Sequence, residues 1–206
     1  MKEIDMLAMV RANGFRLGNA QDRQGGTGCT VLVFPDSAPC AVDVRGGGPA
    51  SRESELLSPM AAASGIHAIL LSGGSAFGLN ASTGVMQYLE EQHIGFDTRI
   101  CKVPLVVESC IYDLGCGDNV RPDAAMGYAA CQAAEKGDFR EGCYGAGTGA
   151  TVGKLCGPDY MMKSGLGAYA VQVGDLQVGA VVSVNAVGDV ALIQIRRCRR
   201  SFGCRC

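Results

Sequence analysis

Three polar residues lie at positions where folded proteins often carry catalytic side chains. Asn185 follows an apolar run, and an asparagine amide is a neutral donor suited to stabilising an oxyanion. Tyr112 lies inside the apolar run 110–114, where a buried hydroxyl would need a partner. Lys154 ends the Gly-rich stretch 142–154, and a poorly solvated amine there could act on a reacting centre. The structural alternatives are a turn asparagine, a core tyrosine and a surface lysine.

The Gly-rich stretch itself resembles two nucleotide motifs but completes neither. Residues 145–150 (Gly-Ala-Gly-Thr-Gly-Ala) match Gly-x-Gly-x-x-Ala, but no strong strand pattern precedes them and no acid follows at the usual distance. The phosphate-loop pattern also fails, because Thr148 stands in place of its first glycine and Leu155 in place of Ser or Thr. We expect no cofactor, and a Gly-rich pocket in which Gly145 and Gly147 contact the substrate.

The sequence also contains a candidate serine nucleophile. The segment 72–78 (Ser-Gly-Gly-Ser-Ala-Phe-Gly) follows an apolar run and opens a helical pattern, where a nucleophile elbow would lie. The elbow requires Gly two residues after the serine, and Phe77 is there instead. Ser75 is then better explained as a helix cap. Pairing of Ser75 with His67 or His93 stays open as an alternative.

Composition limits the classes of protein to consider. The chain has 206 residues, 48% hydrophobic and 18% charged, which excludes disorder and allows one domain with a large core. The net charge is −2, but residues 191–206 contain five Arg and no acid, so the remainder carries 13 bases against 20 acids, or −7. An acidic body argues against a nucleic-acid binder.

The cysteines and the N-terminus indicate a cytoplasmic protein. There are eleven Cys, none spaced as Cys-x-x-Cys, and two His, so a metal site is not expected. We expect reduced core thiols, no signal peptide and no membrane span, since no apolar run reaches the ~18 residues that a span needs.

Apolar runs separated by turn residues predict strands in pairs with helices between the pairs, hence an α/β (α+β) fold with a mixed or antiparallel sheet. The expected strands are 29–34 and 40–44 as a hairpin, 66–71, 103–107 and 110–114, and 168–173 with 178–184 as a second hairpin. The expected helices are 76–92 and 124–135, the latter starting at Pro122-Asp123.

Nine segments in order together resemble the L-aminopeptidase/D-esterase (DmpA-type) family, which includes β-aminopeptidases and nylon-oligomer hydrolases. They are 26–32, 42–47, 72–79, 85–91, 111–114, 121–123, 145–154, 163–167 and 184–189. Each segment is weak alone, but the ordered set is specific.

The resemblance implies a self-cleaving hydrolase with an N-terminal Ser or Thr nucleophile, whose own α-amine acts as the base. It implies the layered α-β-β-α sandwich of the DmpA/ornithine-acetyltransferase type, a small peptide or amide substrate, and a homo-oligomer. Asn185 would be the oxyanion-stabilising asparagine and Tyr112 the active-site tyrosine. Lys154 would match a lysine of the nylon-hydrolase branch, and 72–78 would be structural.

The end of the sequence departs from this family. Residues 1–190 are expected to form the front part of one hydrolase domain, truncated before the nucleophile. The basic tail 191–206 is expected to come from a frameshift, with a genuine partner-binding tail as the alternative. The chain would then be an inactive part of an aminopeptidase or amidase. The competing hypothesis is a stand-alone, non-catalytic module that binds a partner.

Overall fold

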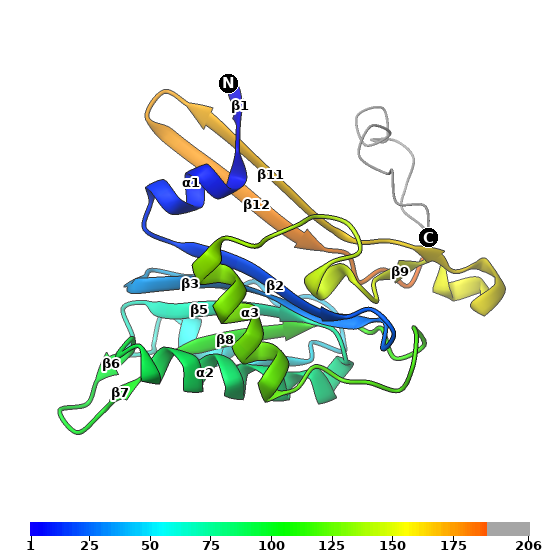
Figure 1. Ribbon diagram of the computed structural model, residues 1–206, viewed down its shortest axis with the longest axis horizontal. Helices are drawn as coiled ribbons and strands as arrows, with labels where there is room; N and C mark the ends of the chain where they lie inside the picture. The colour runs from blue at the N-terminus through cyan, green and yellow to red at the C-terminus, as the bar shows by residue number, and fades with distance from the viewer. Residues whose placement is uncertain (189–206) are drawn as a thin grey trace.

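The computed structural model describes residues 1–188, and its centre is a five-stranded mixed sheet (Figure 1). The sheet has the order β2-β3-β5-β8-β4, with β5 and β8 parallel and the other pairs antiparallel. Its strands are β2 Arg16–Asp22, β3 Thr27–Ala38, β4 Ser51–Arg52, β5 Ile66–Ser72 and β8 Val106–Cys110. The expected mixed sheet is confirmed.

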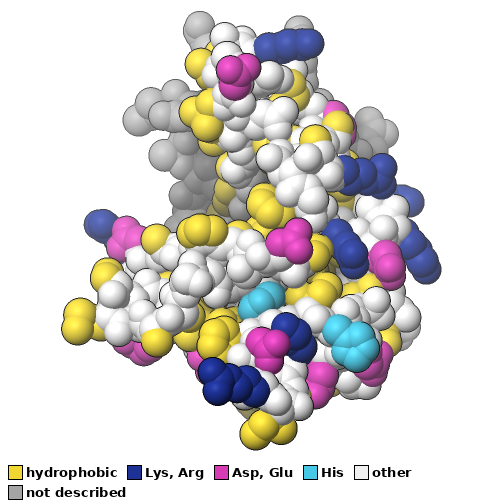
Figure 2. Space-filling model, turned by 90° about the vertical axis from the view of Figure 1, so that its left-hand side faces the viewer, with side chains coloured by type: hydrophobic (Ala, Val, Ile, Leu, Met, Phe, Trp, Pro, Cys, Tyr) yellow, Lys and Arg dark blue, Asp and Glu magenta, His cyan; other side chains and the backbone are white. Residues whose placement is uncertain are grey.

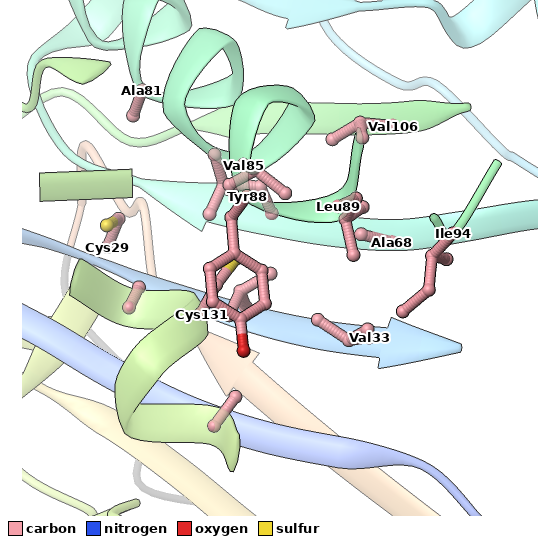
Figure 3. Packing of buried hydrophobic residues seen from close by; sticks show 14 residues of the cluster. Cys29, Val33, Ala68, Ala81, Val85, Tyr88, Leu89, Ile94, Val106 and Cys131 are labelled. Carbon is pink, nitrogen blue, oxygen red and sulfur yellow. The ribbon is translucent and has the colours of Figure 1, made fainter. Parts of the chain in front are cut away.

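Two helices cover one face of this sheet. They are α2 Ala81–Glu91, which continues the 3₁₀ turn η2 Ser75–Asn80, and α3 Ala124–Lys136. Asp123 caps α3, its side chain accepting from the Met126 N–H at 2.9 Å, and Gly137 ends the helix at φ 69°. Figure 3 shows the resulting core, with Val85, Tyr88 and Leu89 of α2 pointing toward Val33 of β3 and Cys131 of α3.

The two helices cross at glycines. A Cβ added to Gly84 of α2 would lie 1.7 Å from the Ala124 carbonyl oxygen, and one added to Gly127 of α3 would lie 2.0 Å from that of Ala81. The helix backbones therefore touch, and nothing larger than hydrogen fits at either position without moving a helix.

We expect Gly84→Ala to lower the free energy of unfolding by about 2 kcal/mol, because overpacking a rigid backbone contact forces the helices apart. Urea unfolding followed by circular dichroism measures the change. Gly115→Ala is the matched control, since a Cβ at Gly115 meets nothing within 4 Å. Equal stability of the two variants would show that the helix crossing is not tightly packed.

A second layer lies on the opposite face of the central sheet. On β3, Cys29 and Val31 face the helices, while Thr30 between them donates to Asn19 Oδ1 at 2.9 Å and accepts from the Ala146 N–H at 3.1 Å. Ala146 belongs to the 3₁₀ turn η3 Gly145–Gly147. Figure 1 shows the long hairpin β11–β12 on this side of the central sheet, with α2 on the other side.

This second sheet is antiparallel, with the order β1-β11-β12. Its strands are β1 Lys2–Ile4, β11 Leu166–Val173 and β12 Leu176–Ser183, and helix α1 Met6–Ala12 packs on it, with Met6 and Met9 over Gly179. The layered α/β architecture and the hairpin expected at 168–184 are confirmed. Large apolar side chains of the hairpin stay about half exposed: Tyr169, Val173, Leu176, Val178 and Val182.

Short elements complete the described part. They are η1 Ser54–Leu57, β6 Phe96–Asp97, β7 Lys102–Val103, β9 Thr151–Val152, η4 Lys154–Cys156, η5 Pro158–Tyr160 and β10 Met162–Lys163. None of the helices within residues 1–188 is long and apolar enough to cross a membrane.

Several expected boundaries are wrong. Residues 40–44 form no strand and lie outside the sheet. The two neighbours of β3 in the sheet are β2 and β5. The apolar run 110–114 leaves the sheet at Cys110 and becomes a loop, so Tyr112 lies beyond the strand end. The tail 191–206, expected to be frameshifted, lies outside the described residues.

Candidate active site

Three segments far apart in the sequence meet beyond the end of β8. The Tyr112 N–H donates to Asn185 Oδ1 at 3.0 Å, and Lys154 Nζ donates to the Ala186 carbonyl at 2.8 Å. Two backbone bonds add to the contact, from Gly153 to Gly188 at 2.9 Å and from Leu155 to Val187 at 2.8 Å. The structure thus brings together Asn185, Tyr112 and Lys154, the three residues singled out as catalytic candidates.

Asn185 has its two side-chain atoms in different roles. Its Oδ1 accepts the Tyr112 N–H, which fixes the side-chain amide and assigns Nδ2 to the other position. Nδ2 makes no hydrogen bond to any residue of 1–188, and the side chain is exposed. Asn185 therefore holds two N–H donors in a fixed direction, as an oxyanion site requires.

Tyr112 is not a core tyrosine. The residue is 54% exposed, whereas its neighbours Ile111 and Asp113 are 6% and 5% exposed. The buried neighbours anchor the loop, and the backbone N–H of Tyr112 contacts Asn185 while its side chain is exposed. Its hydroxyl is accessible to a bound molecule.

Lys154 is half-buried, and its ammonium group lies against backbone oxygens. Nζ donates to the carbonyls of Thr151 at 2.5 Å and Ala186 at 2.8 Å. Burial lowers the pKa of Lys154 from its usual value, and the electrostatic effects of the nearby Cys116 and Asp113 oppose the change. Lys154 thus holds residues 151 and 186 together while placing a positive charge in the site.

We expect the amine of Lys154 to become reactive at a lower pH than an ordinary lysine, because the folded protein disfavours its charged form. The unfolded chain then keeps this proton to higher pH than the folded chain, so stability rises with pH from the folded pKa to about 10.4. Acetylation by acetic anhydride between pH 7 and 11, followed by mass spectrometry, measures the midpoint for Lys154.

N-acetyl-lysine amide in the same solution is the reference. Asp113→Asn is expected to lower the midpoint further, because Asp113 opposes the shift. A midpoint at or above that of the reference would contradict the burial of this amine.

Asp113 is a buried residue that the sequence did not single out. Its Oδ2 accepts from Thr27 Oγ1 at 2.8 Å, and its Oδ1 accepts from the Gly74 N–H at 2.6 Å. Gly73 and Gly149 approach it so closely that an added Cβ would lie 1.9 Å and 2.5 Å from Oδ2. Asp113 therefore ties together the loops after β5 and β8, the start of β3 and the Gly-rich stretch.

The Gly-rich stretch is packed inside the protein. Gly145 adopts φ 50°, and a Cβ on it would lie 2.2 Å from Thr30 Oγ1; one on Gly147 would lie 2.2 Å from the Leu166 nitrogen. Lys163 Nζ also donates to the Thr148 carbonyl. Both glycines are buried, so they support the site from beneath, and their contact with substrate stays a prediction.

The alternative Ser75–His67 pair is wrong. Ser75 follows the end of β5 and His67 is near its start, so the strand separates them by roughly 20 Å at ~3.3 Å per residue. His93 follows the end of α2, whereas Ser75 begins the turn η2 that precedes this helix, so the length of α2 separates His93 from Ser75. Ser72 is fully buried, donating to Glu108 Oε1 at 2.7 Å.

Comparisons with known proteins agree with this architecture. A model described as peptidase family S58 matches residues 9–199. An uncharacterised aminopeptidase of Mycobacterium leprae (strain TN) is 42% identical over 172 residues, covering 79% of this chain and 46% of that protein. A 6-aminohexanoate-oligomer endohydrolase of Kocuria sp. (strain KY2) is 36% identical over 178 residues, covering 86% and 47%.

A solved structure shares the fold. The L-aminopeptidase D-Ala-esterase/amidase of Ochrobactrum anthropi, described as a variant of the Ntn-hydrolase fold, superposes with a TM-score of 0.58 at 16% identity, covering 83% of this chain and 50% of that one. The chain thus spans about half the length of the relatives that it matches.

Proposed function

The chain belongs to peptidase family S58, and on that premise we propose that it supplies the oxyanion-binding side of an aminopeptidase or amidase active site. The observation that carries the proposal is the orientation of Asn185, whose oxygen is occupied by the Tyr112 N–H and whose two N–H donors have no partner among residues 1–188. A short peptide or small amide is the substrate class that this chemistry suits.

In the proposed reaction, a Ser or Thr hydroxyl attacks the amide carbonyl carbon, and its proton passes to its own α-amine. The carbonyl oxygen becomes an oxyanion, to which Asn185 Nδ2 donates. The tetrahedral intermediate then collapses and expels the amine, which takes the proton and leaves the acyl group as an ester on the nucleophile. Water attacks this ester, which releases the carboxylic acid and restores the hydroxyl. The nucleophile is expected from the resemblance, and it is none of the residues placed here in the site.

Lys154 and Tyr112 have supporting roles in this proposal. The Lys154 ammonium stabilises the developing negative charge mainly through its field, since two of its three N–H donors already bond to Thr151 and Ala186. The accessible Tyr112 hydroxyl orients the substrate. Gly145 and Gly147 keep the floor of the site close to the sheet.

A hybrid enzyme tests the proposal. Residues 1–188 of this chain replace the matching part of the Kocuria endohydrolase, which provides the remaining half and a known amide substrate. We expect this hybrid to hydrolyse linear 6-aminohexanoate oligomers above the uncatalysed rate, measured by release of free amino groups. The unmodified Kocuria enzyme is the control, and a folded, inactive hybrid would contradict the proposal.

A second candidate function is partner binding without catalysis. The half-exposed apolar side chains of β11–β12 favour it, because a contiguous apolar surface is usually covered by something. Assembly of the protein as a homo-oligomer would also cover this surface and is retained as a proposal. An active hybrid favours the first candidate over the second.

A further inference from the structure

A cavity of about 330 Å³ opens at the end of the central sheet away from Asn185. Four parts of the chain line it: the end of β3, the loop before β5, the loop after α2 and the β6–β7 hairpin. The residues that matter for its chemistry are Asp36, Ser37, His67, His93, Asp97 and Lys102. Its size is at the lower end of the range for small-molecule sites.

His67 presents a hydrogen-bond donor to this cavity. The residue is 7% exposed, and its Nδ1 accepts the Leu105 N–H at 3.2 Å, so the ring is the Nε2–H tautomer. Burial and the nearby Lys102 charge lower its pKa, which keeps the ring neutral at pH 7. Nε2 has no hydrogen-bond partner among residues 1–188. It is also not among their side-chain atoms that are both fully buried and unpaired, so it is accessible from the cavity that His67 lines.

The charged groups around the cavity are unevenly paired. Asp97 accepts from the Arg99 N–H at 2.7 Å and from Lys102 Nζ at 3.3 Å, which leaves Lys102 two donors with no partner in the described part of the chain. Asp36 makes no hydrogen bond or ion pair with any described residue. Figure 2 views this end, and basic and acidic side chains lie between the two histidines. The cavity thus offers donors for an anion and a free carboxylate for a cation.

Two residues of the cavity have left-handed backbones without being glycine. Ser37 has φ 62°, and His93 has φ 57° at the position after α2 where glycine is usual. Such conformations cost about 1 kcal/mol for a residue with a Cβ. Side chains kept at strained positions around one cavity are a sign of a functional site.

We propose that this cavity binds a small free amino acid in its zwitterionic form. The carboxylate accepts from His67 Nε2 and Lys102 Nζ, and the ammonium group donates to Asp36. The site is independent of the proposed function, because it shares no residue with the Asn185 site and lies at the other end of β5.

Mixed charge is what selects this ligand class. A simple anion would meet the unpaired Asp36 carboxylate, and a simple cation would meet Lys102, so each would be opposed by a like charge. A zwitterion satisfies both groups at once.

The chain's two histidines make the test direct. The ring Hε1 signals of the 206-residue chain are recorded by ¹H–¹³C NMR at pH 7 in 150 mM NaCl and titrated with glycine, acetate and methylammonium separately. His93→Gly assigns the two signals. We expect a saturable shift of the His67 signal with millimolar glycine, and at least tenfold weaker responses to acetate and methylammonium.

Two variants check the roles. Asp36→Asn is expected to weaken glycine about tenfold and leave acetate unchanged or tighter, whereas Lys102→Met weakens both. Since Gly relieves the strained backbone, His93→Gly is expected to raise the melting temperature. Acetate as strong as glycine would mean a plain anion site, and no His67 shift up to 100 mM glycine would mean no site. Either result from the unmodified chain overturns the proposal.

Discussion

Replacing Asn185 with alanine in the hybrid enzyme lowers kcat/KM by about 10²–10³-fold, the usual effect of removing one oxyanion donor. The loss falls mainly on kcat, because the donors act on charge that develops only in the transition state. Initial rates with 6-aminohexanoate oligomers measure the effect.

The melting temperature provides the control for this variant. Asn185 is exposed, and within residues 1–188 its side chain makes one hydrogen bond, from the Tyr112 N–H, so the hybrid is expected to melt within a few degrees of the unmutated one. Tyr112→Phe removes only a hydroxyl and is expected to raise KM more than it lowers kcat. Unchanged kinetics for Asn185→Ala would rule out its oxyanion role.

Replacing Asp113 with alanine lowers the free energy of unfolding by about 3–6 kcal/mol, since two hydrogen bonds to a charged group are worth about 1.5–3 kcal/mol each. The variant leaves the buried Thr27 hydroxyl and the buried Gly74 N–H without their hydrogen-bond acceptor. It also frees four segments of the chain from one anchor. Urea unfolding of the 206-residue chain measures the loss as a lower midpoint at constant slope.

Graded variants separate the hydrogen bonds from simple loss of volume. Asp113→Asn retains an acceptor for Gly74 and is expected to cost about 1 kcal/mol, the worth of one ordinary hydrogen bond. Thr27→Val removes only the bond to Oδ2. If Asp113→Ala were as stable as Asp113→Asn, the carboxylate would not be the anchor that the geometry indicates.

The helices and the second hairpin could be predicted because their signals are local. Asp123 three residues before Met126 and Gly137 after Lys136 are ordinary start and stop signals, and α3 begins and ends there. The prediction of a strand at 40–44 was wrong because tertiary contacts decide which strand pairs with β3. The edge of β3 that it would need is occupied by β5, which follows in sequence but has a longer apolar run.

The site could be predicted only as separate residues. Nothing in the spacing of Tyr112, Lys154 and Asn185 requires them to meet; the ordered resemblance to a family suggested it. Their contact depends on backbone bonds between 153–155 and 187–188, which leave no side-chain pattern. Asp113 was missed because its partners are glycines and a threonine, whose closeness to it appears only in three dimensions.

The most direct test of the proposed oxyanion role of Asn185 is the Asn185→Asp substitution in the hybrid enzyme. Aspartate keeps an oxygen for the Tyr112 N–H but replaces both Nδ2 donors with a negative charge. We predict an unchanged melting temperature and activity no higher than that of Asn185→Ala. Activity equal to that of the unmutated hybrid would contradict this role, because it would show that the oxyanion is stabilised without the asparagine N–H donors.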